Sequence, residues 1–194
     1  RLVLSAKDYQ EVLKDLDSKE ATAAKTIVID TAGALVEYLK DWAMDTKPGA
    51  KDKNGNWNGL KGFGFVKAEL DSFVNKLKNV MNKNIVFIFH ADEKVDREGN
   101  PIQRLRCEGS FRNTVWTGID FGALIQLQGG KRYANFTPDD DNPAKGCHGI
   151  EGKIEIPRLD DTVKNDFLAW LFDTARKNMQ AENDAVTARI NGYQ

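Results

Sequence analysis

A carboxylate and a hydroxyl follow one of the most apolar stretches of the sequence. Residues 26–29, Thr-Ile-Val-Ile, are all β-branched, and Asp30 and Thr31 come directly after them. A run that is apolar on both faces predicts a buried strand of a parallel sheet, and open α/β sheets bind ligands outside the carboxyl ends of such strands. Magnesium bound together with phosphates takes a carboxylate ligand there, often through a retained water. Asp30 is therefore a candidate magnesium ligand, and the alternative is an Asp that only caps the next helix.

A second apolar run ends in a histidine. Residues 84–89, Asn-Ile-Val-Phe-Ile-Phe, predict another buried strand, and His90 stands at its carboxyl end. An imidazole in this position can be aimed at a bound phosphate and respond to its presence. A histidine that only makes a structural hydrogen bond explains the pattern equally well, so both roles stay open.

The segment after His90 is rich in charge. Residues 96–101, Asp-Arg-Glu-Gly-Asn-Pro, predict a turn between two ribbon-like arms. Proteins that bind single-stranded nucleic acid combine basic side chains with aromatic rings, and Phe111 and Trp116 are near enough in sequence to supply the rings. Acidic residues are interleaved with the basic ones, so a solvated loop of mixed charge is the alternative. The basic residues of this candidate DNA-binding cluster are Lys94, Arg97, Arg104, Arg106 and Arg112.

The elements that would position these side chains alternate between strand and helix. Residues 2–4 read as a strand, and residues 7–16 have apolar side chains at helical spacing, with Asp8 as a candidate cap. With the strand ending at Asp30 they form a βαβ unit, whose strands are parallel. Further helices are predicted from Thr31, a candidate cap, to residue 44 and over residues 65–81, with a long surface loop at 45–64. The fold class predicted is α/β, with a mostly parallel sheet flanked by helices.

The second half of the chain predicts a β-hairpin and a terminal helix. Residues 121–128 read as a strand, Gly129 and Gly130 as a hairpin turn, and residues 131–136 as the returning strand. Residues 107–117 are ambiguous and could hold a short helix, whereas residues 137–157 read as irregular. Helical spacing resumes over residues 165–193. We expect a core domain over residues 1–157 and a C-terminal helical segment over residues 158–194.

Composition excludes several classes of protein. The 194 residues are 41% hydrophobic and 29% charged with a net charge of −1, so a globular core is expected and any DNA contact must use a local patch. The two cysteines and two histidines lack the spacing of a zinc site. No apolar run is long enough to span a membrane and no signal peptide is evident, so we expect a cytoplasmic protein.

The order of these parts resembles the RecA-like ATPases of the P-loop NTPase class, and within them AAA-type nucleotide-binding proteins of phages and prophages linked to recombination and single-strand annealing. Residues 26–31 look like the magnesium-binding Walker B strand, and residues 84–90 look like the next strand, whose end carries a polar sensor. The resemblance implies that ATP and Mg bind at Asp30 with Thr31 beside it, and that Asp30 and His90 are catalytic. It also implies single-stranded DNA on the loop after His90 and a homo-oligomer with nucleotide between subunits. An arginine of that loop could instead reach a neighbouring subunit's phosphates.

The phosphate-binding loop of that family is missing from the sequence. No Gly-x-x-x-x-Gly-Lys-Ser/Thr occurs, and the Gly-Lys pairs at 130–131 and 152–153 do not join a strand to a helix with the required upstream glycine. In the family this loop lies before the first strand seen here, and because the chain opens without Met we expect a fragment. These residues alone should bind nucleotide poorly. The alternative function is a non-catalytic α/β scaffold or assembly protein that binds protein or DNA.

Overall fold

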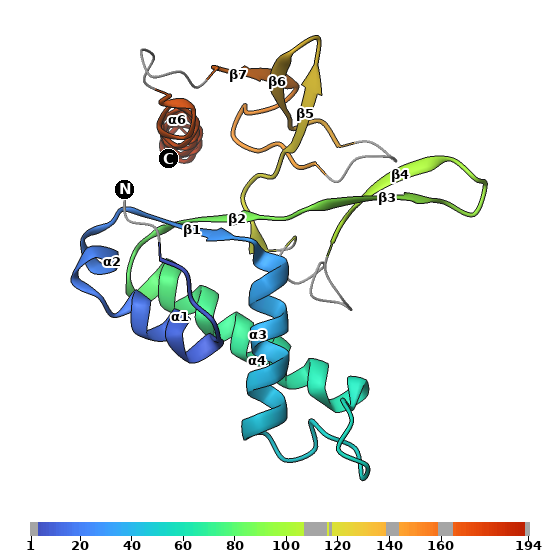
Figure 1. The fold of residues 1–194 in the computed structure, drawn as a ribbon. Helices are drawn as coiled ribbons and strands as arrows, with labels where there is room; N and C mark the ends of the chain where they lie inside the picture. Colours follow the sequence, from blue (N-terminus) through green and yellow to red (C-terminus); the bar gives the residue numbers. More distant parts are fainter. Residues whose placement is uncertain (1–3, 107–115, 117, 139–143, 159–164, 193–194) are drawn as a thin grey trace. The chain divides into compact units, whose positions relative to one another are not determined.

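The computed structural model of the chain describes residues 4–106, 116, 118–138, 144–158 and 165–192 (Figure 1). Two compact units make up the chain, the first from residues 1–92 and 105–117 and the second from residues 93–104 and 118–194. Both contain helices or strands that pack around apolar side chains, and the α/β fold class is confirmed. The predicted boundary at residue 157 stays a prediction.

The first unit is built around one pair of parallel strands. Strand β1 (Thr26–Asp30) pairs with β2 (Asn84–Ile88) so that Asp30 lies opposite Ile88. Both strands were predicted, but the prediction that they are buried on both faces was wrong, because Val28 is 48% exposed and Ile88 is 40% exposed. Helices lie on one side of the pair (Figure 1), and among the described residues no third strand joins it. A longer parallel sheet is therefore not established.

The helices occur in the order that the sequence predicts, with one further short helix, over residues 19–23, that was not predicted. They are α1 (Tyr9–Leu16), α2 (Lys19–Ala23), α3 (Ala32–Thr46) and α4 (Gly59–Asn75), the last continuing into the π-helix η1 (Lys76–Val80). The Asp8 carboxylate accepts a hydrogen bond from the Glu11 amide at 2.8 Å, so its predicted role as a cap is confirmed. The predicted strand at residues 2–4 falls almost wholly outside the described residues, and Leu4 has no regular structure.

The core of the first unit gathers around Tyr9. Its ring lies 5.8 Å from the ring of Trp42 on α3 and 6.2 Å from that of Phe73 on α4, so three helices meet there. The hydroxyl donates to the Glu69 carboxylate at 2.8 Å. Burial of the ring raises the pKa of Tyr9, and the hydrogen bond to Glu69 and the negative charge of Glu69 raise it further. The phenol therefore stays protonated.

The connection between α3 and α4 is shorter than predicted. Helix α4 begins at Gly59, so residues 59–64 are helical and not part of a loop, and Asn58 caps them by accepting from the Lys61 amide. The indole of Trp57 packs closely against Gly62 in this added turn: a methyl group at that position would lie 2.3 Å from the ring. Gly62 is a packing glycine, which the sequence pattern does not distinguish from a loop glycine.

A two-stranded ribbon follows β2, as the sequence predicts. Strands β3 (Ala91–Val95) and β4 (Pro101–Leu105) pair with each other. In the turn between them the Asp96 carboxylate accepts hydrogen bonds from the Asn100 side chain at 3.0 Å and from the amides of Asn100 and Glu98. These bonds lower the pKa of Asp96, and they hold the turn shape. Of the short helix suggested for residues 107–117, nearly all lies outside the described residues.

The second unit contains an antiparallel sheet and the terminal helix. Strands β5 (Leu124–Gln128), β6 (Lys131–Asn135) and β7 (Lys153–Ile156) pair in that order, and Gly129 and Gly130 make the predicted hairpin turn with φ of 58° and 78°. Strand β7 lies in the segment predicted to be irregular, and that prediction was wrong. Its alternating apolar residues, Ile154 and Ile156, are too few to signal a strand between Gly152 and Pro157, but both pack on the core.

Helix α6 (Phe167–Asn191) confirms the predicted C-terminal helix. Its Leu171 is buried in a cluster with Ala134, Phe136 and Ile150, so the helix covers the core of the antiparallel sheet. Among the helices of the described residues, α6 included, none combines the length and apolar character needed to cross a bilayer.

The contact between Trp57 and Gly62 predicts opposite effects for two neighbouring glycines of α4. Gly62→Ala should lower the free energy of unfolding by about 1–3 kcal/mol, because the added methyl group collides with the indole. Gly64→Ala should raise it by about 1 kcal/mol, since a methyl group at Gly64 meets open space and alanine favours helix. Urea denaturation of both variants measures the difference, and equal effects would contradict the packing described.

Candidate functional site

Asp30 and His90 lie at the same edge of the parallel strand pair. Asp30 is the last residue of β1 and stands opposite Ile88, and His90 comes two residues further along the chain from Ile88. Both side chains are exposed. Because parallel strands end at a common edge, the fold places at one end of the pair the two residues that the family resemblance implied to be catalytic.

Thr31 begins helix α3. Its hydroxyl accepts a hydrogen bond from the Ala34 amide at 3.4 Å, and its carbonyl accepts from the Ala34 and Leu35 amides at 3.1 and 3.4 Å. Thr31 therefore caps α3, as predicted, and the alternative in which Asp30 caps this helix is wrong. The peptide bond between the two residues is cis. Because Thr31 fills the cap position, the Asp30 carboxylate is left exposed beside the positive end of a fifteen-residue helix.

Arg106 ties the base of the β3–β4 ribbon to the strand ends. Its backbone amide donates to the carbonyl of His90 at 2.7 Å, and its side-chain Nε donates to Asp92 Oδ1 at 2.7 Å. The ion pair is largely exposed and contributes at most about 1 kcal/mol. The amide contact matters more for the site, because it fixes the backbone of His90 to the start of the segment that follows β4.

Gly33 is a residue of the site that the sequence analysis missed. It lies in the first turn of α3, and a methyl group there would come within 3.2 Å of the Arg106 carbonyl oxygen. Such an approach of two backbones favours glycine, which has no Cβ. The signal available in the sequence was a glycine three residues after Asp30, at a position where helices normally carry a side chain.

The predicted DNA-binding residues lie mainly on the ribbon. Lys94 and Arg104 belong to its strands, Arg97 to its turn and Arg106 to its base, and all four are exposed. Arg112 lies outside the described residues, as does Phe111. The interleaved Glu93 and Glu98 are exposed as well, so the ribbon presents mixed charge as the sequence indicated.

The site suits magnesium bound with phosphates better than magnesium held by the protein alone. In the part of the chain that the structure describes, no three His, Cys, Asp or Glu side chains come close enough to hold a metal ion. One exposed carboxylate, Asp30, matches the usual magnesium site, in which waters and phosphate oxygens supply most ligands. The match is partial, because the 194 residues contain no phosphate-binding loop.

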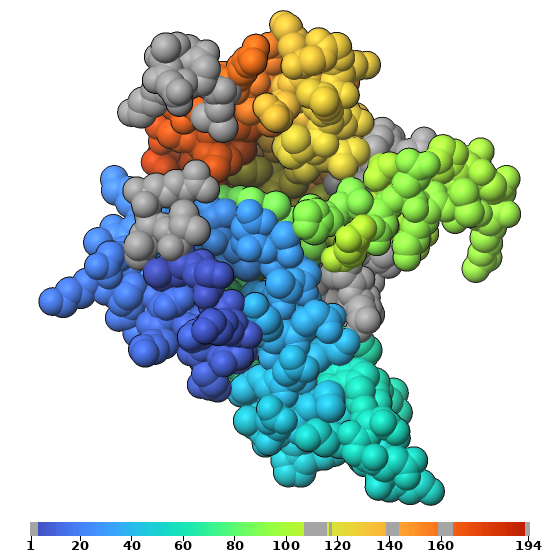
Figure 2. Space-filling view, viewed as in Figure 1, coloured from blue at the N-terminus to red at the C-terminus, as the bar shows by residue number. Residues whose placement is uncertain are grey.

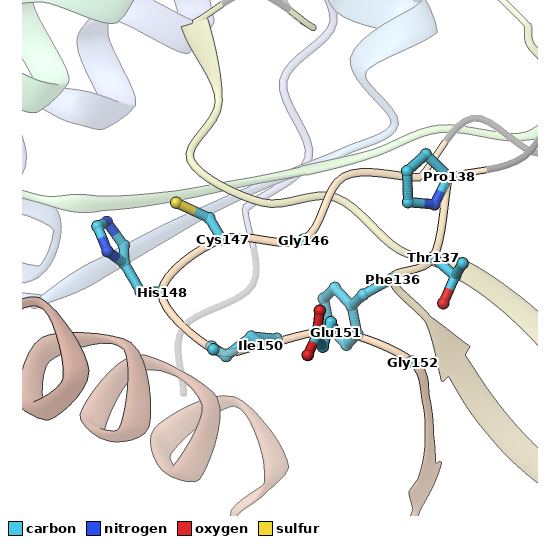
Figure 3. A pocket seen from close by; sticks show the side chains of 10 residues that line it. Phe136, Thr137, Pro138, Gly146, Cys147, His148, Ile150, Glu151 and Gly152 are labelled. Carbon is cyan, nitrogen blue, oxygen red and sulfur yellow. The ribbon is translucent and has the colours of Figure 1, made fainter.

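The second unit has an open hollow of about 650 Å³ (Figure 3). Its walls are residues 136–138 and 146–152, and none of the predicted site residues contributes to it. One of its residues, His148, is engaged with α6, since its Nδ1 lies 2.9 Å from the Glu182 carboxylate and its carbonyl accepts from the Asn178 side chain. These contacts hold the 147–150 turn to the helix, which is a structural role.

The family model of the AAA domain matches residues 3–148, well over half of the chain. The chain belongs to the AAA domain family. Asp30, Thr31 and His90 all fall within the match, and the AAA-type, P-loop ATPase-like character expected from the sequence is confirmed at this level. Such domains bind nucleotide and usually magnesium. Neither the curated proteins nor the solved structures contain a significant match to the chain.

The cap at Thr31 can be tested by substitution. Thr31→Ala removes the side-chain acceptor for the Ala34 amide and should lower the free energy of unfolding by about 0.5–2 kcal/mol. Thr31→Ser keeps a hydroxyl in the same place and should stay within about 0.5 kcal/mol of the wild type. Thermal or urea unfolding measures both, and equal losses in the two variants would show that the methyl group, not the cap, matters.

Proposed function

We propose that this chain is part of an ATP-binding, ATP-hydrolysing domain, with nucleotide and magnesium at the carboxyl edge of β1 and β2. The observation that carries the proposal is the exposed Asp30 carboxylate at the end of β1, next to the strand that leads to His90. Membership of the AAA domain family supports it independently.

Each residue has a distinct role in this proposal. Asp30 holds the magnesium ion through a water molecule, with Thr31 beside it at the start of α3. A magnesium ion bound there would supply positive charge against the phosphates. His90 responds to the terminal phosphate, and its carbonyl, bonded to the Arg106 amide, passes the change in nucleotide state to the ribbon.

The ribbon is the proposed contact with single-stranded DNA. Its exposed basic residues, Lys94, Arg97 and Arg104, lie on the two-stranded arm that β3, β4 and their turn form (Figure 1). A phage-type RecA-like recombination or annealing protein would couple hydrolysis to DNA through such an arm. In that arrangement the protein is a homo-oligomer, with nucleotide between subunits.

The proposal requires a phosphate-binding loop, which these 194 residues do not contain. Experiments on hydrolysis therefore use the protein as its whole gene encodes it. The same observation favours a second candidate function, a non-catalytic α/β scaffold that keeps the fold and binds protein or DNA. The two functions differ in one measurable property, the hydrolysis of ATP by the full-length protein.

Removal of the Asp30 carboxylate should abolish hydrolysis. We expect Asp30→Ala to reduce kcat by about 100-fold or more, because the magnesium ion loses its protein contact, while the unfolding temperature stays within a few degrees of the wild type. Steady-state phosphate release over a range of magnesium concentrations measures the loss.

Asp41→Ala is the matched control, since Asp41 is an exposed aspartate further along α3. It should leave kcat unchanged. Full activity in Asp30→Ala would exclude the magnesium role, and no ATP hydrolysis by the wild-type protein would favour the scaffold.

DNA binding by the ribbon should depend on salt. For single-stranded DNA we expect log affinity to fall linearly with log salt concentration, and the double variant Arg97→Ala/Arg104→Ala to reduce the slope by roughly 1 to 1.5, since two phosphate contacts are lost. Fluorescence anisotropy at several salt concentrations measures the slope.

The pair Arg176→Ala/Arg189→Ala removes the same charge from exposed positions of α6 and should leave the slope unchanged. Equal effects of the two double variants would show that only net charge matters. Absence of binding at low salt would remove DNA from the proposal.

A further inference from the structure

Strand β5 forms an open edge of the antiparallel sheet. The strand order places β5 at one edge and β7 at the other, and within the described residues no strand pairs with the outer side of β5. The hairpin of β5 and β6, coloured yellow, lies on the surface in Figure 2. An open edge has unpaired N–H and C=O groups, which can bind another strand.

The sequence of β5 offers no protection against such pairing. Its five residues, Leu-Ile-Gln-Leu-Gln, include no charge and no proline, the features that usually prevent edges from associating. Ile125 is 58% exposed and Leu127 72% exposed. The opposite edge strand, β7, carries Lys153 and Glu155.

The hairpin turn determines which backbone groups are available. A two-residue turn at Gly129 and Gly130 makes Gln128 and Lys131 a hydrogen-bonded pair, and hydrogen bonding then alternates along the strand. Leu124, Gln126 and Gln128 therefore bond to β6. The N–H and C=O groups of Ile125 and Leu127, the two exposed apolar residues, point to the outer edge.

We propose that β5 pairs antiparallel with β5 of a second copy of this chain, about a two-fold axis at Gln126. Ile125 of each copy then lies opposite Leu127 of the other, and both residues exchange backbone hydrogen bonds across the axis. The two three-stranded sheets become one sheet of six strands. The partner is a second copy because the strand complements itself in this register.

Two physical features favour this register. It places Ile125 of one copy beside Leu127 of the other. Both lie on the same face of the sheet as Ala134 and Ile154, which belong to the core of the second unit. Because β5 carries no charge, no like-charge repulsion arises between the two paired strands. An axis at Ile125 or Leu127 would use the same outward groups but overlap fewer residues of the strand.

The proposal does not depend on the nucleotide site, because β5 and its neighbours belong to the second unit. The predicted contact is small compared with stable interfaces, so we expect association in the micromolar range. Its failure would leave the ATPase proposal untouched.

Sedimentation velocity of the chain from low to high micromolar concentration tests the association. The wild type should change from monomer to dimer, and Leu127→Lys should weaken the dimer by about ten-fold or more, because a charge enters the paired edge. Leu60→Lys is the matched control: Leu60 is 93% exposed on α4, and the variant should dimerise like the wild type. A wild type that stays monomeric, or a Leu127→Lys variant that dimerises normally, overturns the proposal.

A cross-linking experiment tests the register and needs no destabilising change. In the proposed pairing Gln126 faces itself across the axis with the two Cα atoms about 4.5 Å apart, a separation that a disulfide can bridge. Gln126→Cys should therefore give a covalent dimer under mild oxidation, above the background that Cys107 and Cys147 give in the wild type.

Gln128→Cys is the control for the cross-link. Gln128 lies on the same face of β5 and is more exposed than Gln126, but its counterpart in the second copy would be roughly 13 Å away. It should stay at the wild-type background. Equal cross-linking of the two variants, or none in Gln126→Cys, would overturn the register.

Discussion

The parallel pairing of β1 with β2 constrains the whole of the first unit. Because the strands run in the same direction, Asp30 and the segment that leads to His90 leave the sheet at one edge. In an antiparallel pair these residues would be separated by the length of a strand, roughly 16 Å. The backbone hydrogen bonds of this pair therefore do more to define the site than any contact between the functional side chains.

At the boundary between β1 and α3, Thr31 caps the helix and its neighbour Asp30 is left exposed. Thr31 satisfies the first turn of the helix, so the Asp30 carboxylate is not used in capping and remains exposed. Gly33 then allows the Arg106 carbonyl to come close to the helix, while the Arg106 amide holds the carbonyl of His90. The start of the helix, the end of β2 and the base of the ribbon are thereby fixed to one another by backbone contacts.

The two units carry different kinds of surface. The edge of the parallel pair exposes a carboxylate and an imidazole, groups suited to a charged ligand and its metal. The outer edge of β5 exposes apolar side chains, and no strand of the described residues pairs with it. A lone carboxylate is a weak magnesium site unless phosphate oxygens supply further ligands, and the loop that would hold those phosphates in the proposed site is not among the 194 residues. Membership of the AAA domain family and the absence of that loop both have to be explained by any account of the protein.

Local patterns in the sequence determined the longer helices, the main strands, the β3–β4 and β5–β6 turns and the caps at Asp8 and Thr31, because each depends on residues a few positions apart. The tertiary structure decided what depends on distant neighbours. Trp57 packs against Gly62 in a helix that already begins at Gly59, and residues 153–156 form a strand whose isoleucines pack on the core of the second unit. Among the described residues of the first unit the helices lie on one side of the parallel pair, and Val28 is exposed, although the strand read as buried on both faces. Periodicity reports which side chains could be buried, but only the position of the neighbouring elements determines which of them are.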